Sequence, residues 1–157
     1  MNSQDLKSDY NELFFSTYDE VMIDPNRFFG IFLGKFLSYP DVQNLFENID
    51  IMTLNITMHR AFVIMVEYAK THVTSRELIE LARHHRMKKV SAEYYEHFRD
   101  ALIEALKEYC SEFTEAHVEA WRIMLTPSIA VLRQNALNQT EQSANKSEPA
   151  PKIQQLG

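Results

Sequence analysis

The sequence predicts an all-α protein, and three observations carry this prediction. Only three glycines occur in 157 residues, at Gly30, Gly34 and Gly157, so the tight turns that β-hairpins need are scarce. Apolar residues recur at three- and four-residue spacing, as on one face of a helix, and capping side chains or prolines stand at expected helix starts. We expect one domain over residues 1–135. Residues 136–157, rich in Asn, Gln, Ser and Pro, predict a disordered tail.

Charge and cysteine content exclude several classes of function. The chain carries 22 acidic and 16 basic residues, a net charge of -6, which disfavours a nucleic-acid partner. Cys110 is the only cysteine, so an internal disulfide and a cysteine-based zinc site are excluded. The longest apolar run, Ala61–Val66, is far shorter than a membrane span, and residues 1–9 are polar and acidic. We therefore expect a cytoplasmic protein without a membrane partner.

Two helices are predicted before Pro40. The first covers residues 8–22, with Ser8 as its cap. The second begins at Asp24-Pro25, where the aspartate can accept from a free amide and the proline lacks an N–H that would be unpaired. Its buried face consists of four phenylalanines at helical spacing: Phe28, Phe29, Phe32 and Phe36. Pro40 ends this helix because proline interrupts the hydrogen-bond ladder.

A long helix is predicted over residues 50–70. Its most polar positions, separated by three, seven and four residues, mark a solvent-facing stripe: Thr57, Arg60, Glu67 and Thr71. The opposite, inward face then consists of Met58, Phe62, Met65, Val66 and Ala69.

Three further helices complete the predicted domain. Thr74 and Glu77 have the spacing of a capping box and open a helix that ends at His85. Two long amphipathic helices follow, over residues 91–109 and 114–134.

Among the residues that could carry chemistry, the pattern favours His85. The sequence has no glycine-rich phosphate loop and no His-Glu-x-x-His motif. His84 and His85 point about 100° apart on a helix, so only one can face the core. His85 continues the apolar face of Leu78, Leu81 and Ala82. An inward histidine is often only a hydrogen-bonded core residue, so position alone leaves both roles open.

Several segments in order resemble the bacterial globins, both single-domain haemoglobins and the globin half of flavohaemoglobins. The resemblance covers residues 9–133 and implies a globin fold of six to eight helices around a haem pocket. The matching segments are Tyr39-Pro40-Asp41-Val42 with Leu45-Phe46, Leu81-Ala82-Arg83-His84-His85 followed by Val90 and Tyr95, and Ala120-Trp121.

On the proximal side, the resemblance implies that His85 ligates the iron of haem b. Its other ring N–H would donate to a backbone carbonyl, for which Leu81 is the expected acceptor. Tyr95 would lie behind the histidine, either tuning it as in flavohaemoglobins or serving only as a core aromatic residue. Ala136 stands near the position of the glutamate that assists this tuning in flavohaemoglobins, which puts strong proximal activation in doubt.

The resemblance also implies contacts around the haem. Phe46 would stack against the porphyrin, and His84, Lys88 and Lys89 would lie where the propionates emerge, although ordinary surface positions are an equal alternative. Phe32 stands where relatives often carry a tyrosine that donates to bound oxygen. Phenylalanine cannot donate, so weaker oxygen retention is implied.

Two registers compete on the distal side. The stripe of polar residues favours Met58 and Phe62 over the iron, an apolar pocket. The alternative places His59 there, as in the His-x-x-x-Val pattern of many globins, where it could contact the gas or bind iron. This alternative register would turn Glu67 inward, and burying a lone carboxylate is energetically costly. We favour the apolar register.

The implied function is reversible binding of O2, NO or CO for carriage, sensing or scavenging, by a monomer or homodimer. Weak peroxidase or NO dioxygenase activity would be secondary, and the latter would require a separate reductase. The main alternative is a globin-like signalling or interaction module without haem. A plain helical-bundle adaptor would leave the matching segments as coincidence.

Overall fold

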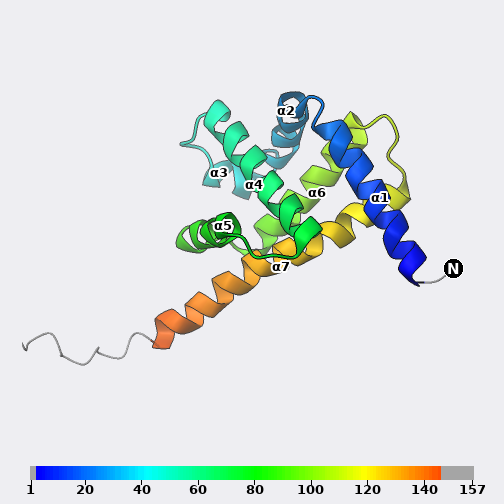
Figure 1. The fold of residues 1–157 in the computed structure, drawn as a ribbon. Coiled ribbons are helices and arrows are strands. Elements are labelled where there is room, and N and C mark those ends of the chain that lie inside the picture. Colours follow the sequence, from blue (N-terminus) through cyan, green and yellow to red (C-terminus); the bar gives the residue numbers. More distant parts are fainter. Residues whose placement is uncertain (1–2, 146–157) are drawn as a thin grey trace, which may run out of the picture.

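The computed structural model describes residues 3–145, and over this range it forms seven α-helices and no strand (Figure 1). The all-α prediction is therefore confirmed. The helices are α1 (Ser3–Val21), α2 (Pro25–Phe36), α3 (Pro40–Leu45), α4 (Ile51–Thr71), α5 (Arg76–Met87), α6 (Ala92–Tyr109) and α7 (Glu115–Asn145).

Local capping explains where α2, α4 and α5 begin. Ser8, the predicted cap of the first helix, instead lies inside α1. The Asp24 side chain accepts from the Arg27 backbone N–H at 3.3 Å, as expected for the start of α2. Asp50 caps α4 in the same way. The predicted cap of α5 is wrong by one residue, because Ser75 rather than Thr74 accepts from the Leu78 N–H at 3.1 Å. Helix α5 also continues past His85 to Met87.

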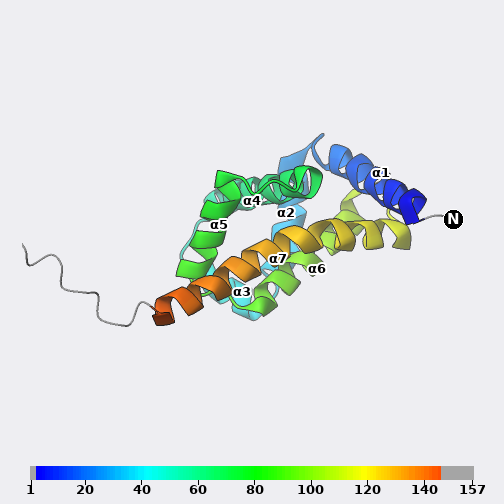
Figure 2. The same ribbon diagram turned by 60° about the horizontal axis from the view of Figure 1, so that its bottom comes forward.

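The helices pack on one another around a shared core. Helix α2 packs on α6, while α7 contacts α1, α4, α5 and α6. Figure 2 shows α7 running along α6 beneath α4 and α5. Helix α4 also packs on α2 and α5, so α4 and α5 close one side of the molecule over α6 and α7. Within residues 3–145, no helix combines the length and apolar character that crossing a membrane requires.

The core is built on aromatic packing around Trp121. This side chain is fully buried, and its indole N–H donates to the Thr17 hydroxyl at 2.7 Å. Phe62 stacks on Trp121 with the rings 8° from parallel and 5.9 Å apart. The predicted inward face of α4 is confirmed: Met58, Phe62, Met65, Val66 and Ala69 are all buried. The predicted polar stripe is confirmed as exposed at Thr57, Arg60, Glu67 and Thr71.

Helix α7 extends beyond the predicted end of the domain. It reaches Asn145, past the boundary expected at residue 135. Residues 146–157 of the predicted tail lie outside the described residues, so the disorder of that part stays a prediction.

Candidate functional site

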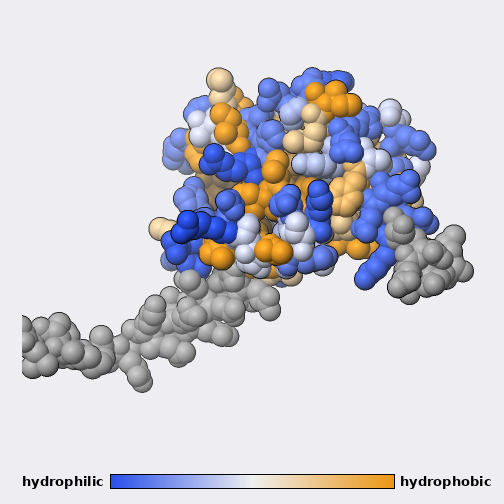
Figure 3. Space-filling view, in the orientation of Figure 1, coloured by the Kyte–Doolittle hydropathy of each residue, from blue (hydrophilic) through white to orange (hydrophobic). Residues whose placement is uncertain are grey.

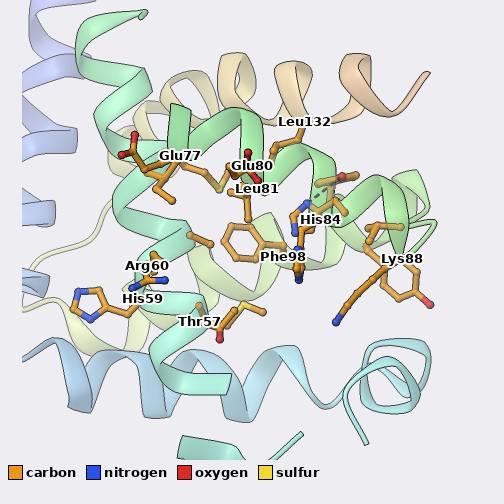
Figure 4. Close-up of a pocket in the computed structure, with 18 of the residues that line it drawn as sticks. Thr57, His59, Arg60, Glu77, Glu80, Leu81, His84, Lys88, Phe98 and Leu132 are labelled. Carbon is orange, nitrogen blue, oxygen red and sulfur yellow. Dashed lines mark hydrogen bonds between the residues drawn. The ribbon is translucent and has the colours of Figure 1, made fainter. Parts of the chain in front are cut away.

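A cavity of about 900 Å³ lies between α4 and α5 (Figure 4). Phe36, Phe46, Phe98 and Leu132 contribute to its lining from α2, the end of α3, α6 and α7. Most of its lining is apolar, and its polar side chains come largely from exposed positions of α4 and α5. Its volume is near the upper end of the range of about 300–1,000 Å³ for ligand and cofactor sites. The cavity is therefore large enough for a sizeable and mostly apolar group.

His85 lines this cavity from α5 and contacts α6 through its ring. The Tyr95 hydroxyl lies 3.3 Å from Nδ1 of His85, and Tyr95 is 5% exposed. The sequence-based expectation was that the Leu81 carbonyl would be the partner of this nitrogen, and it is wrong. In the helix that carbonyl stands four residues before His85, where it is the acceptor for the His85 backbone N–H. The ring instead reaches across to α6.

The surroundings of His85 favour its neutral form. Burial, followed by the nearby charges of His84 and Lys88, lowers the pKa of His85 from 6.5 to about 4. Burial raises the pKa of Tyr95 to about 12, so its hydroxyl stays protonated. If Nδ1–H donates to the Tyr95 oxygen, Nε2 keeps the lone pair that a metal requires. This chemistry fits an iron ligand.

The distal wall contains residues from both predicted registers. Met58 is buried and lines the cavity, as the apolar register expects. His59 also lines it, but its ring stacks on Phe29 at 5.0 Å and lies to one side in Figure 4. Thr57 and Arg60 line the cavity as well, although the sequence placed them on the solvent-facing stripe. These two side chains are exposed and also line the cavity, because the cavity opens toward solvent along this side of α4.

Two predicted contact residues lie behind the cavity lining. Phe62 is fully buried but does not line the cavity, because its ring packs on Trp121 and Phe29. Phe32 is also fully buried and absent from the lining, with its ring 5.3 Å from those of Phe36 and Phe98. Helical periodicity identifies an inward face, but it does not separate positions that face a cavity from those that face the core.

The basic end of α5 is only partly at the cavity. His84 and Lys88 line it, as the resemblance implied. Lys89, where the backbone is left-handed with φ 55°, does not line it. The Ala136 side chain lies outside those that the structure describes.

Other polar residues of the lining were missed by sequence reasoning. Arg60 on α4 and Arg76, Glu77 and Glu80 on α5 all line the cavity. For α5 a signal existed, because Glu77, Glu80, His84 and Lys88 have the spacing of one helix face. Among residues 3–145, no group of three or more His, Cys, Asp or Glu side chains could hold a metal ion.

Comparison with known proteins agrees with this architecture. A family model described as Globin matches residues 30–132. The structure is similar to that of a protein from Pseudomonas aeruginosa PAO1 described as structurally highly homologous to a human hemoglobin. The two are 23% identical with a TM-score of 0.73, over 81% of this chain and 98% of that chain, a likeness that shows the fold alone. No curated protein matches the chain. Because the family model spans more than half of the residues, this chain belongs to the globin family.

Proposed function

We propose that this globin holds haem b in the cavity between α4 and α5 and reversibly binds O2, NO or CO for carriage, sensing or scavenging. The observation that carries the proposal is His85, a neutral, half-buried imidazole on the wall of a large apolar cavity. We place the protein in the cytoplasm, in keeping with its single cysteine.

The residues of the cavity would have separate roles in holding the cofactor. His85 would provide Nε2 to the iron, and Tyr95 would hold its ring in the tautomer that leaves Nε2 free. Phe46 and Phe98 would pack against the porphyrin. The propionates would accept hydrogen bonds at the exposed side of the cavity, where Lys88 supplies a cationic donor and His84 a ring N–H. Bound haem would supply an iron with one position open to a diatomic ligand.

The distal residues favour an apolar ligand site. Met58 presents an apolar, buried side chain at the wall. The Thr57 hydroxyl donates to the Thr53 carbonyl at 2.8 Å, so its proton is already used within α4. His59 would have to leave its stack on Phe29 to reach a ligand or the iron. We therefore keep the apolar register, with His59 as the alternative.

Visible spectroscopy of the protein reconstituted with haem tests the proposal. We expect a stoichiometric Soret band that shifts when CO is added to the ferrous form. His85→Ala should lose stoichiometric haem binding. His72→Asn is the matched control, because His72 is exposed and has a left-handed backbone that asparagine tolerates.

Each other outcome has a defined meaning. Equal haem loss in both variants would contradict the assignment of His85. A six-coordinate ferrous spectrum without added ligand that is lost in His59→Ala would move His59 to the iron, because Met58 is the other side chain of the wall that could bind there. No specific haem uptake by the wild type would favour the globin-like signalling or interaction module. Peroxidase or NO dioxygenase activity remains secondary in this proposal, and the latter depends on a separate reductase.

A further inference from the structure

A strongly basic segment, Arg83–Lys89, stands out from this acidic chain. It contains four of the 16 lysines and arginines, and no acidic residue lies between Glu80 and Glu93. The protein as a whole carries a net charge of -6. The basic segment is therefore a local positive region on a negative molecule, which is the arrangement that steers an acidic partner to one place.

The basic segment is exposed and borders the cavity. Lys88 and Lys89 are exposed, and Met87 between the cations is 73% exposed. His84 and Lys88 line the cavity, so the segment continues directly from the site to the outer surface. In Figure 3, strongly hydrophilic side chains cover the region where Figure 1 places α5, next to hydrophobic side chains near the centre of this face.

Interactions within the protein use only some of the cations of this basic segment. Among the ion pairs of the described residues, this segment contributes one, between Arg83 and Glu80 at 3.5 Å. Arg86 lies in the last turn of α5, where a cation interacts favourably with the helix dipole. Lys88 and Lys89 lie beyond the end of the helix, where this interaction fades. The charge of Lys89 is therefore free to meet a partner, whereas Lys88 also lines the cavity, where it would pair with a haem propionate.

We propose that the basic segment is the docking surface for an acidic protein that donates single electrons to the haem. The inference rests on the proposed function, because O2 and CO bind the ferrous iron. In this step the donor loses one electron and the ferric iron gains it, and no covalent bond forms or breaks. The segment contains His85, the proposed iron ligand, so a donor docked here lies close to the site that it reduces.

An acidic protein fits this surface better than an anionic membrane. A membrane would also face the acidic remainder of the chain, and four cations are at the lower limit of the roughly 4–8 that lipid-binding segments use. Transient electron-transfer complexes need only a small interface, less than about 1,200 Å² in total. A single patch of this kind suffices for them.

The test measures reduction of the ferric haem protein by flavodoxin hydroquinone, an acidic flavin protein, in a stopped-flow experiment. The variant is Arg86→Glu with Lys89→Glu, because neither residue lines the cavity. The matched control is Lys107→Glu with Arg122→Glu, which reverses the same number of charges on α6 and α7 outside the cavity. A second readout, independent of reduction, is the set of backbone amide shifts that redox-inactive apoflavodoxin induces in the protein as purified.

We expect the second-order rate constant at low salt to fall about tenfold or more in the variant and to change less than twofold in the control. Added salt should slow the wild type and have little effect on the variant. The amide shifts should cluster at residues 83–90. Equal rates for wild type and variant, with shifts elsewhere or absent, would overturn the proposal.

Two other outcomes remain distinct. Binding to vesicles that contain phosphatidylserine, without a flavodoxin effect, would assign the segment to a membrane and overturn this proposal. Absence of a Soret band would end the haem proposal itself and with it the electron-transfer role. The amide shifts would then still show whether the segment binds an acidic protein.

Discussion

The Tyr95 hydroxyl lies 3.3 Å from Nδ1 of His85 and connects α6 to the cavity wall formed by α5. The two residues are ten apart in the sequence, and a connector between the helices brings them together. This contact selects the orientation of the imidazole and, when Nδ1–H is the donor, leaves Nε2 free for iron.

Replacing Tyr95 with Phe should weaken haem retention while the fold stays intact. The variant removes the hydroxyl that contacts Nδ1 of His85, and loss of such a partner weakens metal sites by about 10–100-fold. We expect haem transfer to an acceptor apoglobin to accelerate about tenfold. Tyr94→Phe is the control, because the Tyr94 hydroxyl donates to the Asp41 carbonyl instead, at 3.4 Å. Equal acceleration in both variants would show that the His85 contact has no special role.

The free energy of unfolding of the apoprotein should depend on pH through His85. Its pKa is about 4 in the folded state, chiefly because burial penalises the charged ring, and about 6.5 when unfolded. Between these values the unfolded chain binds a proton that the folded chain does not. The free energy of unfolding is therefore not reduced by this group above pH 6.5. Between pH 6.5 and pH 4 it falls by about 1.4 kcal/mol for each unit by which the pH is lowered.

Urea unfolding at pH 7 and pH 5 measures this contribution. We expect the wild type to lose about 2 kcal/mol more than His85→Phe between these two conditions. The exposed-site variant His72→Asn should follow the wild type. A His85→Phe protein with the same pH dependence as the wild type would mean that the ring takes up protons freely in the folded state.

Phe32→Tyr should cost stability without slowing oxygen release. Phe32 is fully buried among phenylalanine rings and does not line the cavity, so a hydroxyl there would meet no ligand. Burying an unpaired hydroxyl costs about 1–3 kcal/mol. We expect that loss in urea unfolding, together with an oxygen dissociation rate within about twofold of the wild type. A markedly slower oxygen release would place residue 32 at the ligand.

Thr17→Val should destabilise the protein by removing the acceptor of a buried indole N–H. The Thr17 hydroxyl accepts from Trp121 at 2.7 Å in the fully buried core. An unsatisfied buried donor costs about 1–3 kcal/mol, measured here by denaturant unfolding with fluorescence of the single tryptophan. Thr17→Ser keeps the hydroxyl and should retain most of the stability lost in the valine variant. Equal losses in the two variants would assign the effect to packing alone.

The sequence by itself determined the local structure of this protein. Asp24-Pro25 and Pro40 mark helix boundaries because caps and prolines act on the nearest backbone groups. The alternation of Met58 and Phe62 with Thr57 and Arg60 separates the buried face of α4 from its exposed face, because a helix repeats every 3.6 residues.

Only the tertiary structure decided which inward residues meet the cavity and which meet the core. Met58 lines the cavity while Phe62, one turn later on the same face, packs on Trp121. The partner of His85 was likewise set by the approach of α6, which brings Tyr95 to Nδ1. Periodicity describes one helix at a time, whereas the position of a cavity depends on how several helices are placed relative to one another.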